Sequence, residues 1–264
     1  MTAPEGHRLQ GVPLSADELD LLMHLMSVDE LPVVLAASPR FDSADARDIA
    51  FDRARASLGA RGLLPGGHPR PDLADRLSVL ARPAVELALR WYTGSGAVSR
   101  MCLAHTPGTT VVALRGPGTY TLTEVDRADP HLVSDVLGPG TGTDVGTVRA
   151  PTTSLVEALT DCTDPAATAR RLRALGVGDA DADRLAYALS RCHAHAEIVA
   201  ITHGDGISRT HGPVTVFDTP EGRIVGTSSV APDGARWSTL GPGGDARVRQ
   251  AVRELLAATG IAPH

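Results

Sequence analysis

A four-residue motif that occurs twice constrains the fold of this chain more than any other feature. Ala-Asp-Arg-Leu at residues 74–77 recurs at residues 182–185. Both copies lie in an expected helix just before a run of expected strands, and around each copy the order is helices, a strand meander and a closing helix. We therefore expect a duplicated α+β protein with its helices in two groups, whose two meanders share one sheet or pack back to back.

Hydrophobic periodicity and turn residues place the expected elements. Ser15 and Glu18 have the spacing of a capping box, which marks the start of the first helix. Residues 85–91 alternate like a half-buried strand, and residues 31–36, which include Pro32, are expected to form an extended segment or edge strand. The other expected strands cover roughly 98–105, 110–114, 119–125, 196–202, 214–218, 223–229 and 235–240, and the helices roughly 15–27, 43–62, 71–82, 130–137, 152–159, 165–175, 179–192 and 246–259.

A Gly-Pro-Gly-Thr-Gly-Thr tract at residues 138–143 marks the expected boundary between the two repeats. We predict a disordered lead over residues 1–13, an N-terminal half-repeat over 14–140 and a C-terminal half-repeat over 141–264. The two halves are expected to form one compact domain overall.

Charge and composition exclude several classes of function. The formal net charge of −6 offers no electrostatic footprint for nucleic acid or an anionic membrane. The chain contains no Lys, which excludes mechanisms that need one. Three dispersed cysteines argue against a disulfide framework, no apolar stretch approaches the ~20 residues of a membrane span, and the N-terminus lacks a signal-peptide pattern. These features predict a cytoplasmic protein.

The residues that could carry chemistry do not form a recognisable catalytic or metal motif. No nucleophile elbow, phosphate loop or zinc-ligand spacing occurs, so we expect no enzyme activity, no cofactor and no metal. The alternative is a small metal-dependent or Ser hydrolase that uses His193, His203 and Asp205. Cys102 lies in the middle of an expected strand, which favours a buried structural thiol.

Several segments taken together resemble the EspG family, cytoplasmic chaperones of actinobacterial type VII (ESX) secretion. The resemblance implies a pseudo-two-fold α+β fold, with a central, mostly antiparallel sheet flanked by two helical bundles. It also implies a chaperone without catalytic residues that binds the helical tip of the PPE subunit in a PE–PPE heterodimer and keeps it soluble for secretion. The segments that carry it are Leu14–Leu22, Glu30–Pro32, Leu58–Leu63, Pro71–Leu77, Leu80–Pro83 and Arg90–Trp91.

Candidate contact residues come from one loop and one strand face. We expect the loop at residues 92–97 and the face formed by two later strands to meet the partner. The alternative for the strand residues is that they face the helices as core, because Val and Ile are usually buried. The chain is expected to be a monomer or a weak homodimer, and a scaffold that dimerises through its sheet is a further possibility. The candidate residues are Tyr92, Thr93, Ser95, Val214, Val216, Ile224 and Thr227.

Overall fold

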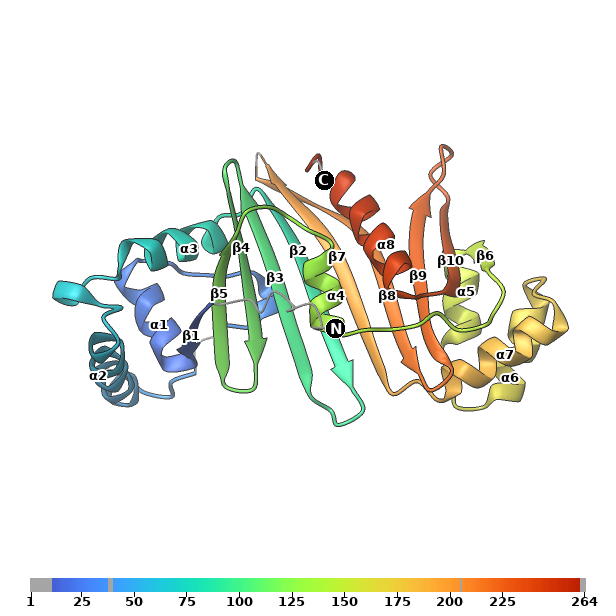
Figure 1. Cartoon of the computed structure of the whole chain (residues 1–264), viewed down its shortest axis with the longest axis horizontal. Helices are drawn as coiled ribbons and strands as arrows, with labels where there is room; N and C mark the ends of the chain where they lie inside the picture. Colours follow the sequence, from blue (N-terminus) through green and yellow to red (C-terminus); the bar gives the residue numbers. More distant parts are fainter. Residues whose placement is uncertain (1–10, 38–39, 205, 262–264) are drawn as a thin grey trace, which may run out of the picture. The chain divides into compact units, whose positions relative to one another are not determined.

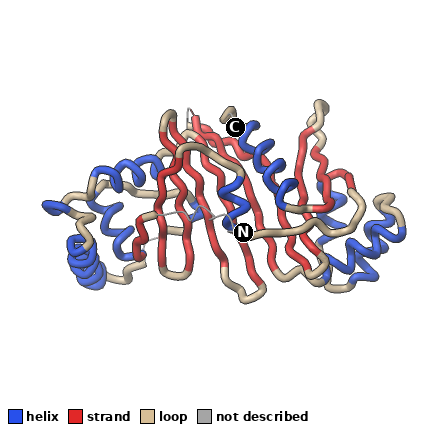
Figure 2. Tube along the Cα trace, viewed as in Figure 1, coloured by secondary structure: helices blue, strands red, loops and turns tan. Residues whose placement is uncertain are grey.

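The computed structural model describes residues 11–37, 40–204 and 206–261. Over these residues the chain is an α+β protein with ten strands of antiparallel sheet and eight α-helices (Figures 1 and 2). It divides into two compact units. Unit 1 comprises residues 1–88, 99–128 and 203–207, and unit 2 comprises residues 89–98, 129–202 and 208–264.

The element order repeats along the chain, which confirms the predicted duplication. In both repeats the first strand pairs antiparallel with the last, so the strand orders are β1-β5-β4-β3-β2 and β7-β8-β9-β10-β6. The predicted division between residues 140 and 141 stays a prediction. The first repeat contains β1 (Val12–Ser15), α1 (Ala16–Leu25), α2 (Ala44–Ala60), α3 (Pro71–Ala81), β2 (Val85–Thr93), β3 (Val98–Thr106), β4 (Thr109–Gly116), β5 (Thr119–Val125) and α4 (His131–Leu137). The second contains β6 (Val148–Pro151), α5 (Thr152–Leu159), α6 (Pro165–Ala174), α7 (Asp179–Ser190), β7 (Ala194–Gly204), β8 (Ile207–Thr219), β9 (Gly222–Val230), β10 (Arg236–Pro242) and α8 (Asp245–Ala257).

The predicted capping box starts α1 and also joins it to α2. The Ser15 N–H donates to Glu18 Oε2 at 2.7 Å, and the Glu18 N–H donates to Ser15 Oγ at 3.2 Å. The Glu18 side chain is buried, where it accepts from Ser57 Oγ at 2.7 Å and pairs with Arg61 at 3.1 Å. The Glu18 carboxylate therefore caps the N-terminus of α1 and also binds residues at the end of α2.

Three expectations for the first repeat are wrong. Residues 12 and 13, placed in a disordered lead, belong to β1 and pair with β5; residues 1–10 of that lead lie outside the described residues. Residues 31–36 are not a strand, because Val33–Leu35 forms a 3₁₀ helix (η1). The Arg115 guanidinium holds this turn by donating to the Leu35 and Ala36 carbonyls at 2.7 and 2.9 Å. Strand β2 is buried on both faces from Val85 to Leu89 rather than half-buried.

In unit 2 the sheet has helices on both faces. Ile224 of β9 packs into the core that α5, α6 and α7 form around Leu172 and Leu185. Successive strand residues point to opposite faces, so Thr227, three residues after Ile224, faces the other way. Thr227 pairs with Val214 of β8, which lies against Leu255 of α8 in a common groove. Helix α8 therefore covers the face opposite α5–α7 (Figure 1).

Candidate partner-binding site

The hairpin between β2 and β3 presents the most accessible of the predicted contact residues. The Thr93 N–H donates to the Ala97 carbonyl at 3.1 Å, and the Gly96 N–H donates to the Thr93 carbonyl at 2.9 Å. Gly96 has a φ of 77°, which a glycine adopts without strain. The Thr93 and Ser95 hydroxyls lie 2.8 Å apart, and residues 94–97 are exposed. The turn is thus hydrogen-bonded, and its small side chains leave its backbone open to a partner.

Tyr92 extends this surface onto β7. Its ring stacks on His195 with centroids 4.6 Å apart and planes inclined by 13°. The next turn residue, Gly94, lies close to β7 as well, since a Cβ placed on it would be 3.1 Å from the His193 carbonyl oxygen. The hairpin therefore rests on the first residues of β7. We call residues 92–97 with His193 and His195 the hairpin end.

A cavity of about 420 Å³ adjoins the hairpin end. Trp91, His193 and Glu221 are among its lining residues. Trp91 Nε1 and Glu221 Oε2 are buried without a hydrogen-bond partner among the described residues, whereas Glu221 Oε1 accepts from Arg191 at 2.6 Å. A buried donor and acceptor left unpaired cost about 1–3 kcal/mol each. Trp91 and Glu221 therefore each keep a buried polar atom without a partner beside this cavity.

Arg223 of β9 holds the loops on the opposite wall of this cavity. Its guanidinium, only 2% exposed, pairs with Asp218 at 2.7 Å and with Asp245, the first residue of α8, at 3.2 Å. It also donates to the carbonyls of Leu137 and Gly138 at 3.3 and 3.2 Å. The end of α4, the start of α8 and the β8–β9 turn thus meet on one buried cation.

The glycine tract expected to link the two repeats is packed against this cation. A Cβ placed on Gly140 would lie 2.5 Å from Arg223 Cζ, so a side chain there would displace the guanidinium. The Gly140 N–H also donates to Asp245 Oδ1 at 2.9 Å. Gly140 is therefore a structural part of the cavity wall.

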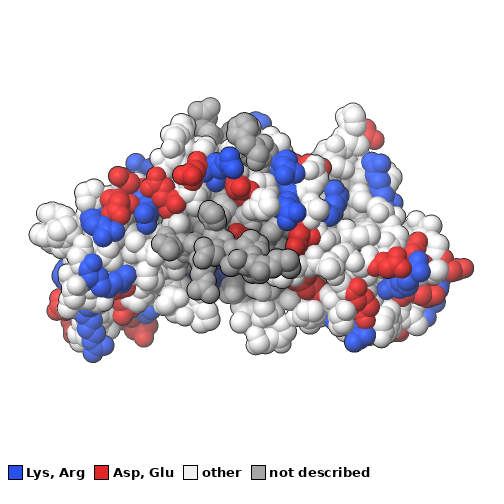
Figure 3. Space-filling view, in the orientation of Figure 1, with Lys and Arg blue, Asp and Glu red and all other residues white. Residues whose placement is uncertain are grey.

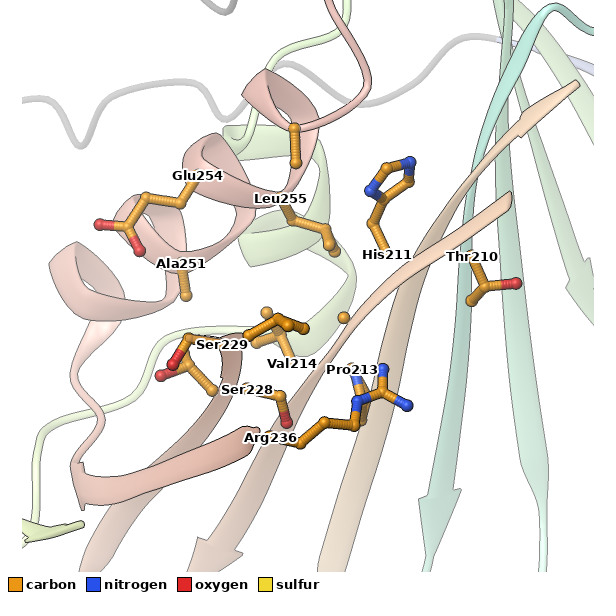
Figure 4. Close-up of a pocket in the computed structure, with 14 residues that line it drawn as sticks. Thr210, His211, Pro213, Val214, Ser228, Ser229, Arg236, Ala251, Glu254 and Leu255 are labelled. Carbon is orange, nitrogen blue, oxygen red and sulfur yellow. The ribbon is translucent and has the colours of Figure 1, made fainter. Parts of the chain in front are cut away.

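The predicted strand face does not form one surface. Val214, Val216 and Ile224 are buried. This agrees with the alternative that the strand residues face the helices as core. Ile224 moreover lies on the sheet face opposite Thr227, so grouping the two was wrong. Thr227 is half-buried and lines a groove together with Val214. Figure 4 shows Val214 in this groove. The structure brings Tyr92, Thr93 and Ser95 together at the hairpin.

This second feature, which we call the α8 groove, lies between α8 and the strands β8 and β9. It has a volume of about 280 Å³, and Figure 4 shows side chains of α8 and of the strands around it. Its apolar wall includes Val214, Ala251 and Leu255, and Arg236 and Glu254 lie at its rim. The lining residues are Thr210–Val214 of β8, Thr227–Val230 of β9, Arg236 of β10, and Ala251, Glu254, Leu255 and Ala258.

The charges and thiols do not concentrate at either feature. Arg and acidic side chains alternate over the face shown in Figure 3. Cys102 is buried, as predicted, and burial followed by the nearby Glu86 carboxylate raises the pKa of its thiol well above the ordinary value. Burial also raises the pKa values of Cys162 and Cys192. A thiol with a raised pKa is a poor nucleophile at neutral pH.

The residues of the hydrolase alternative are not assembled in the described part of the chain. Asp205 lies outside the described residues, and His193 and His203 belong to different units. Across the described ranges, no group of three or more His, Cys, Asp or Glu side chains could hold a metal ion. Among the helices of these ranges, none has the length and apolarity that crossing a bilayer requires.

The fold indicates the class of protein to which the chain belongs. The chain is a duplicated α+β protein in which the first and last strands of each repeat pair antiparallel. The model of the EspG family matches residues 15–254, and the chain belongs to that family.

Individual relatives agree with this assignment. The chain is 28% identical to the ESX-3 secretion-associated protein EspG3 of Mycolicibacterium smegmatis, over 93% of this chain and 86% of the relative. It is also 28% identical to the ESX-1 secretion-associated protein EspG1 of Mycobacterium tuberculosis, over 81% and 76% of the two chains. Its fold matches the type VII secretion system chaperone EspG5 of M. tuberculosis, solved in complex with a PE25–PPE41 dimer. That match has a TM-score of 0.78 and 18% identity, and it covers 94% of this chain and 96% of the other. The comparisons give the hydrolase alternative no support.

Proposed function

We propose that this chain is a cytoplasmic chaperone of a type VII secretion system, which binds the PPE subunit of a PE–PPE-type client and keeps it soluble for export. The observation that carries the proposal is family membership over nearly the whole chain, together with the fold of a chaperone that was solved with such a dimer. The function proposed is binding without catalysis.

The hairpin end is the proposed contact for the helical tip of the client. Tyr92, Thr93 and Ser95 are accessible there, and the hydrogen-bonded turn costs little conformational entropy on binding. Trp91 Nε1 and Glu221 Oε2 are buried beside the hairpin end without partners, and they would pair with the polar backbone groups at the end of a client helix only if binding uncovers them. Val214, Val216 and Ile224 belong to the core and are not proposed as contacts.

Co-expression with a PE–PPE pair from the same genome tests the function. We expect a stable complex on size-exclusion chromatography with light scattering and a larger soluble fraction of the client. The same measurement on the chain alone tests the prediction of a monomer or weak homodimer. Failure of the unmodified chain to bind or solubilise any such pair would refute the chaperone proposal.

Substitutions at the hairpin test the site separately from the function. Ser95→Arg places a long charged side chain on the exposed turn and should weaken client binding at least about tenfold, a loss of about 1.4 kcal/mol. Ala56→Arg adds the same side chain at an exposed position of α2 and should leave binding unchanged. Equal binding by both variants would leave the chaperone function standing and refute the hairpin as its site.

Trp91 supplies a finer test of the cavity. Trp91→Phe keeps an aromatic ring but removes the unpaired N–H. If the client supplies an acceptor, binding should weaken by about 1 kcal/mol, which is a factor of about five. Unchanged affinity at unchanged thermal stability would show that the client does not use this donor.

A further inference from the structure

Strands β8 and β9 separate where the α8 groove begins. Their antiparallel register ends at the pair Val214 and Thr227. Strand β9 continues to Val230, and its last residues are paired only with β10, in a register that reaches Arg236. Residues 210–213 of β8 and 228–230 of β9 line the two sides of the opening.

The backbone of β9 faces this opening with unpaired groups. The Ala231 N–H donates to the Ala235 carbonyl at 2.8 Å, so the backbone groups of Ala231 point toward the β10 side. Backbone groups alternate in direction along a strand, which turns the N–H and C=O of Ser228 and Val230 toward the β8 side. Because Val214 and Thr227 form a non-hydrogen-bonded pair, the register sets the Ser228 N–H opposite the Pro213 carbonyl, whereas the Ser228 C=O meets no donor there, since Pro213 has no N–H. Among the described residues, the register gives Val230 no partner on β8.

The opening is lined by apolar side chains on one side, and an arginine and a glutamate also line it. Ala251 and Leu255 of α8 form the apolar side together with Val214 (Figure 4). Glu254 already accepts a hydrogen bond from Gln250 at 2.8 Å. Arg236, in contrast, has no ion-pair partner among the described residues and extends into the opening (Figure 4).

We propose that the α8 groove binds an extended segment of a protein partner, which adds to β9 as a short strand. Its backbone would pair with the N–H and C=O groups of Val230 and with the C=O of Ser228. Its apolar side chains would pack on Leu255, and an acidic side chain would pair with Arg236. This inference goes beyond the proposed function, because it concerns a different surface and a different conformation of the bound segment.

An extended segment fits better than a helix because of the backbone. A helix satisfies its own N–H and C=O groups along its length and would leave those of Val230 unpaired. An added strand satisfies them, and side-chain alternation then places every second residue toward α8. Arg236, whose side chain extends into the opening, favours a segment with a carboxylate.

Peptides of matched side-chain chemistry test the proposal. The probe is acetyl-Ser-Val-Asp-Val-Ser-amide, and its control carries a methyl group on the central backbone nitrogen. We expect the probe to bind the full chain with a Kd of about 0.1–1 mM by NMR titration, with shifts confined to the groove. The N-methylated peptide has the same side chains but lacks one backbone donor, so it should bind at least about tenfold more weakly.

Variants of the protein test the contribution of the Arg236 charge separately from that of the backbone hydrogen bonds. Arg236→Gln should weaken binding of the probe about tenfold. When Asp in the probe is replaced by Asn, the unmodified chain and Arg236→Gln should bind it equally, as a double-mutant cycle requires. Arg53→Gln, an exposed arginine of α2, is the matched control and should bind like the unmodified chain. Val230→Pro removes the Val230 N–H, which faces the groove, and should also weaken binding of the probe. An unchanged far-UV circular dichroism spectrum is the folding check.

Three outcomes overturn the proposal. Binding of both peptides with equal affinity would show that the groove recognises side chains alone. Absence of binding at about 1 mM would exclude an acidic extended segment as the occupant. A concentration-dependent dimer that Val230→Pro abolishes would assign the groove to a second copy of this chain instead.

Discussion

Arg223 should contribute more to the stability of unit 2 than any exposed arginine, and Arg223→Met tests this. The substitution keeps the length of the side chain but removes the charge and all its donors. It leaves the Asp218 and Asp245 carboxylates without their cation, at side-chain exposures of 17% and 35%. It also leaves the Leu137 and Gly138 carbonyls without this donor.

The magnitude follows from the cost of breaking a buried ion pair by removing one partner, about 3–5 kcal/mol. For a chain of this length, each 1 kcal/mol lowers Tm by about 2–4 °C. Arg223→Met should therefore lower Tm by about 6–20 °C, measured by circular dichroism. The double variant with Asp245→Asn should be less unstable than the sum of the single effects, because it removes one of the uncompensated charges.

An exposed pair of the same type provides the control. Arg55 and Asp52 lie 3.2 Å apart on α2 with side-chain exposures of 47% and 79%, so Arg55→Met should change stability by less than about 1 kcal/mol. Equal stability losses for the two methionine variants would refute the argument that Arg223 joins the loops around the cavity. Client binding should fall with Arg223→Met but not with Arg55→Met, because only Arg223 supports the wall of that cavity.

Two buried carboxylates predict opposite pH dependences. Burial alone would raise the pKa of Glu18, but hydrogen bonds from Ser15 and Ser57 and the charge of Arg61 lower it overall. Its contribution to stability is thus present above the ordinary Glu pKa and lost as pH falls through the lowered value. Glu18→Gln should therefore flatten the loss of stability that urea melts show as pH falls below the ordinary Glu pKa. Burial raises the pKa of Glu86, and His203 partly offsets this effect. The ionised form of Glu86 therefore destabilises the fold above the raised pKa. Glu86→Gln should be stabilising at neutral pH, and the gain should vanish as pH falls through that pKa.

Local signals in the sequence were sufficient for the helices and most strands. The capping box at Ser15 and Glu18 marked the start of α1, and periodicity placed α5 at residues 152–159, the bounds the structure has. The four-residue strands β1 and β6 have no comparable signal, because each exists only through pairing with a strand far along the chain. Residues 31–36 have strand-like composition, but Arg115 holds them in a turn from 79 or more positions away in sequence.

The candidate site was predictable only in part. The turn expected at residues 92–97 is exposed at residues 94–97, but Tyr92 and Thr93 are half-buried and belong to β2. The period of two along a strand should have separated Ile224 from Thr227, since an odd spacing puts residues on opposite faces. Arg223 gave no signal, because its acidic partners and the carbonyls it binds come together only in the folded chain.

The duplication itself provides an internal comparison for the α8 groove. In the first repeat, β3 and β4 are in register from Arg100 and Arg115 to the turn at Thr106 and Thr109, which leaves only two residues of β3 without a β4 partner. The corresponding strand β8 leaves residues 207–213 without a β9 partner. The helix that closes the second repeat is also longer, with 13 residues in α8 against 7 in α4. Since both repeats share one topology, the fold does not require the opening between β8 and β9. A longer strand and a longer helix that create an opening in one repeat are better explained by an occupant than by the demands of folding.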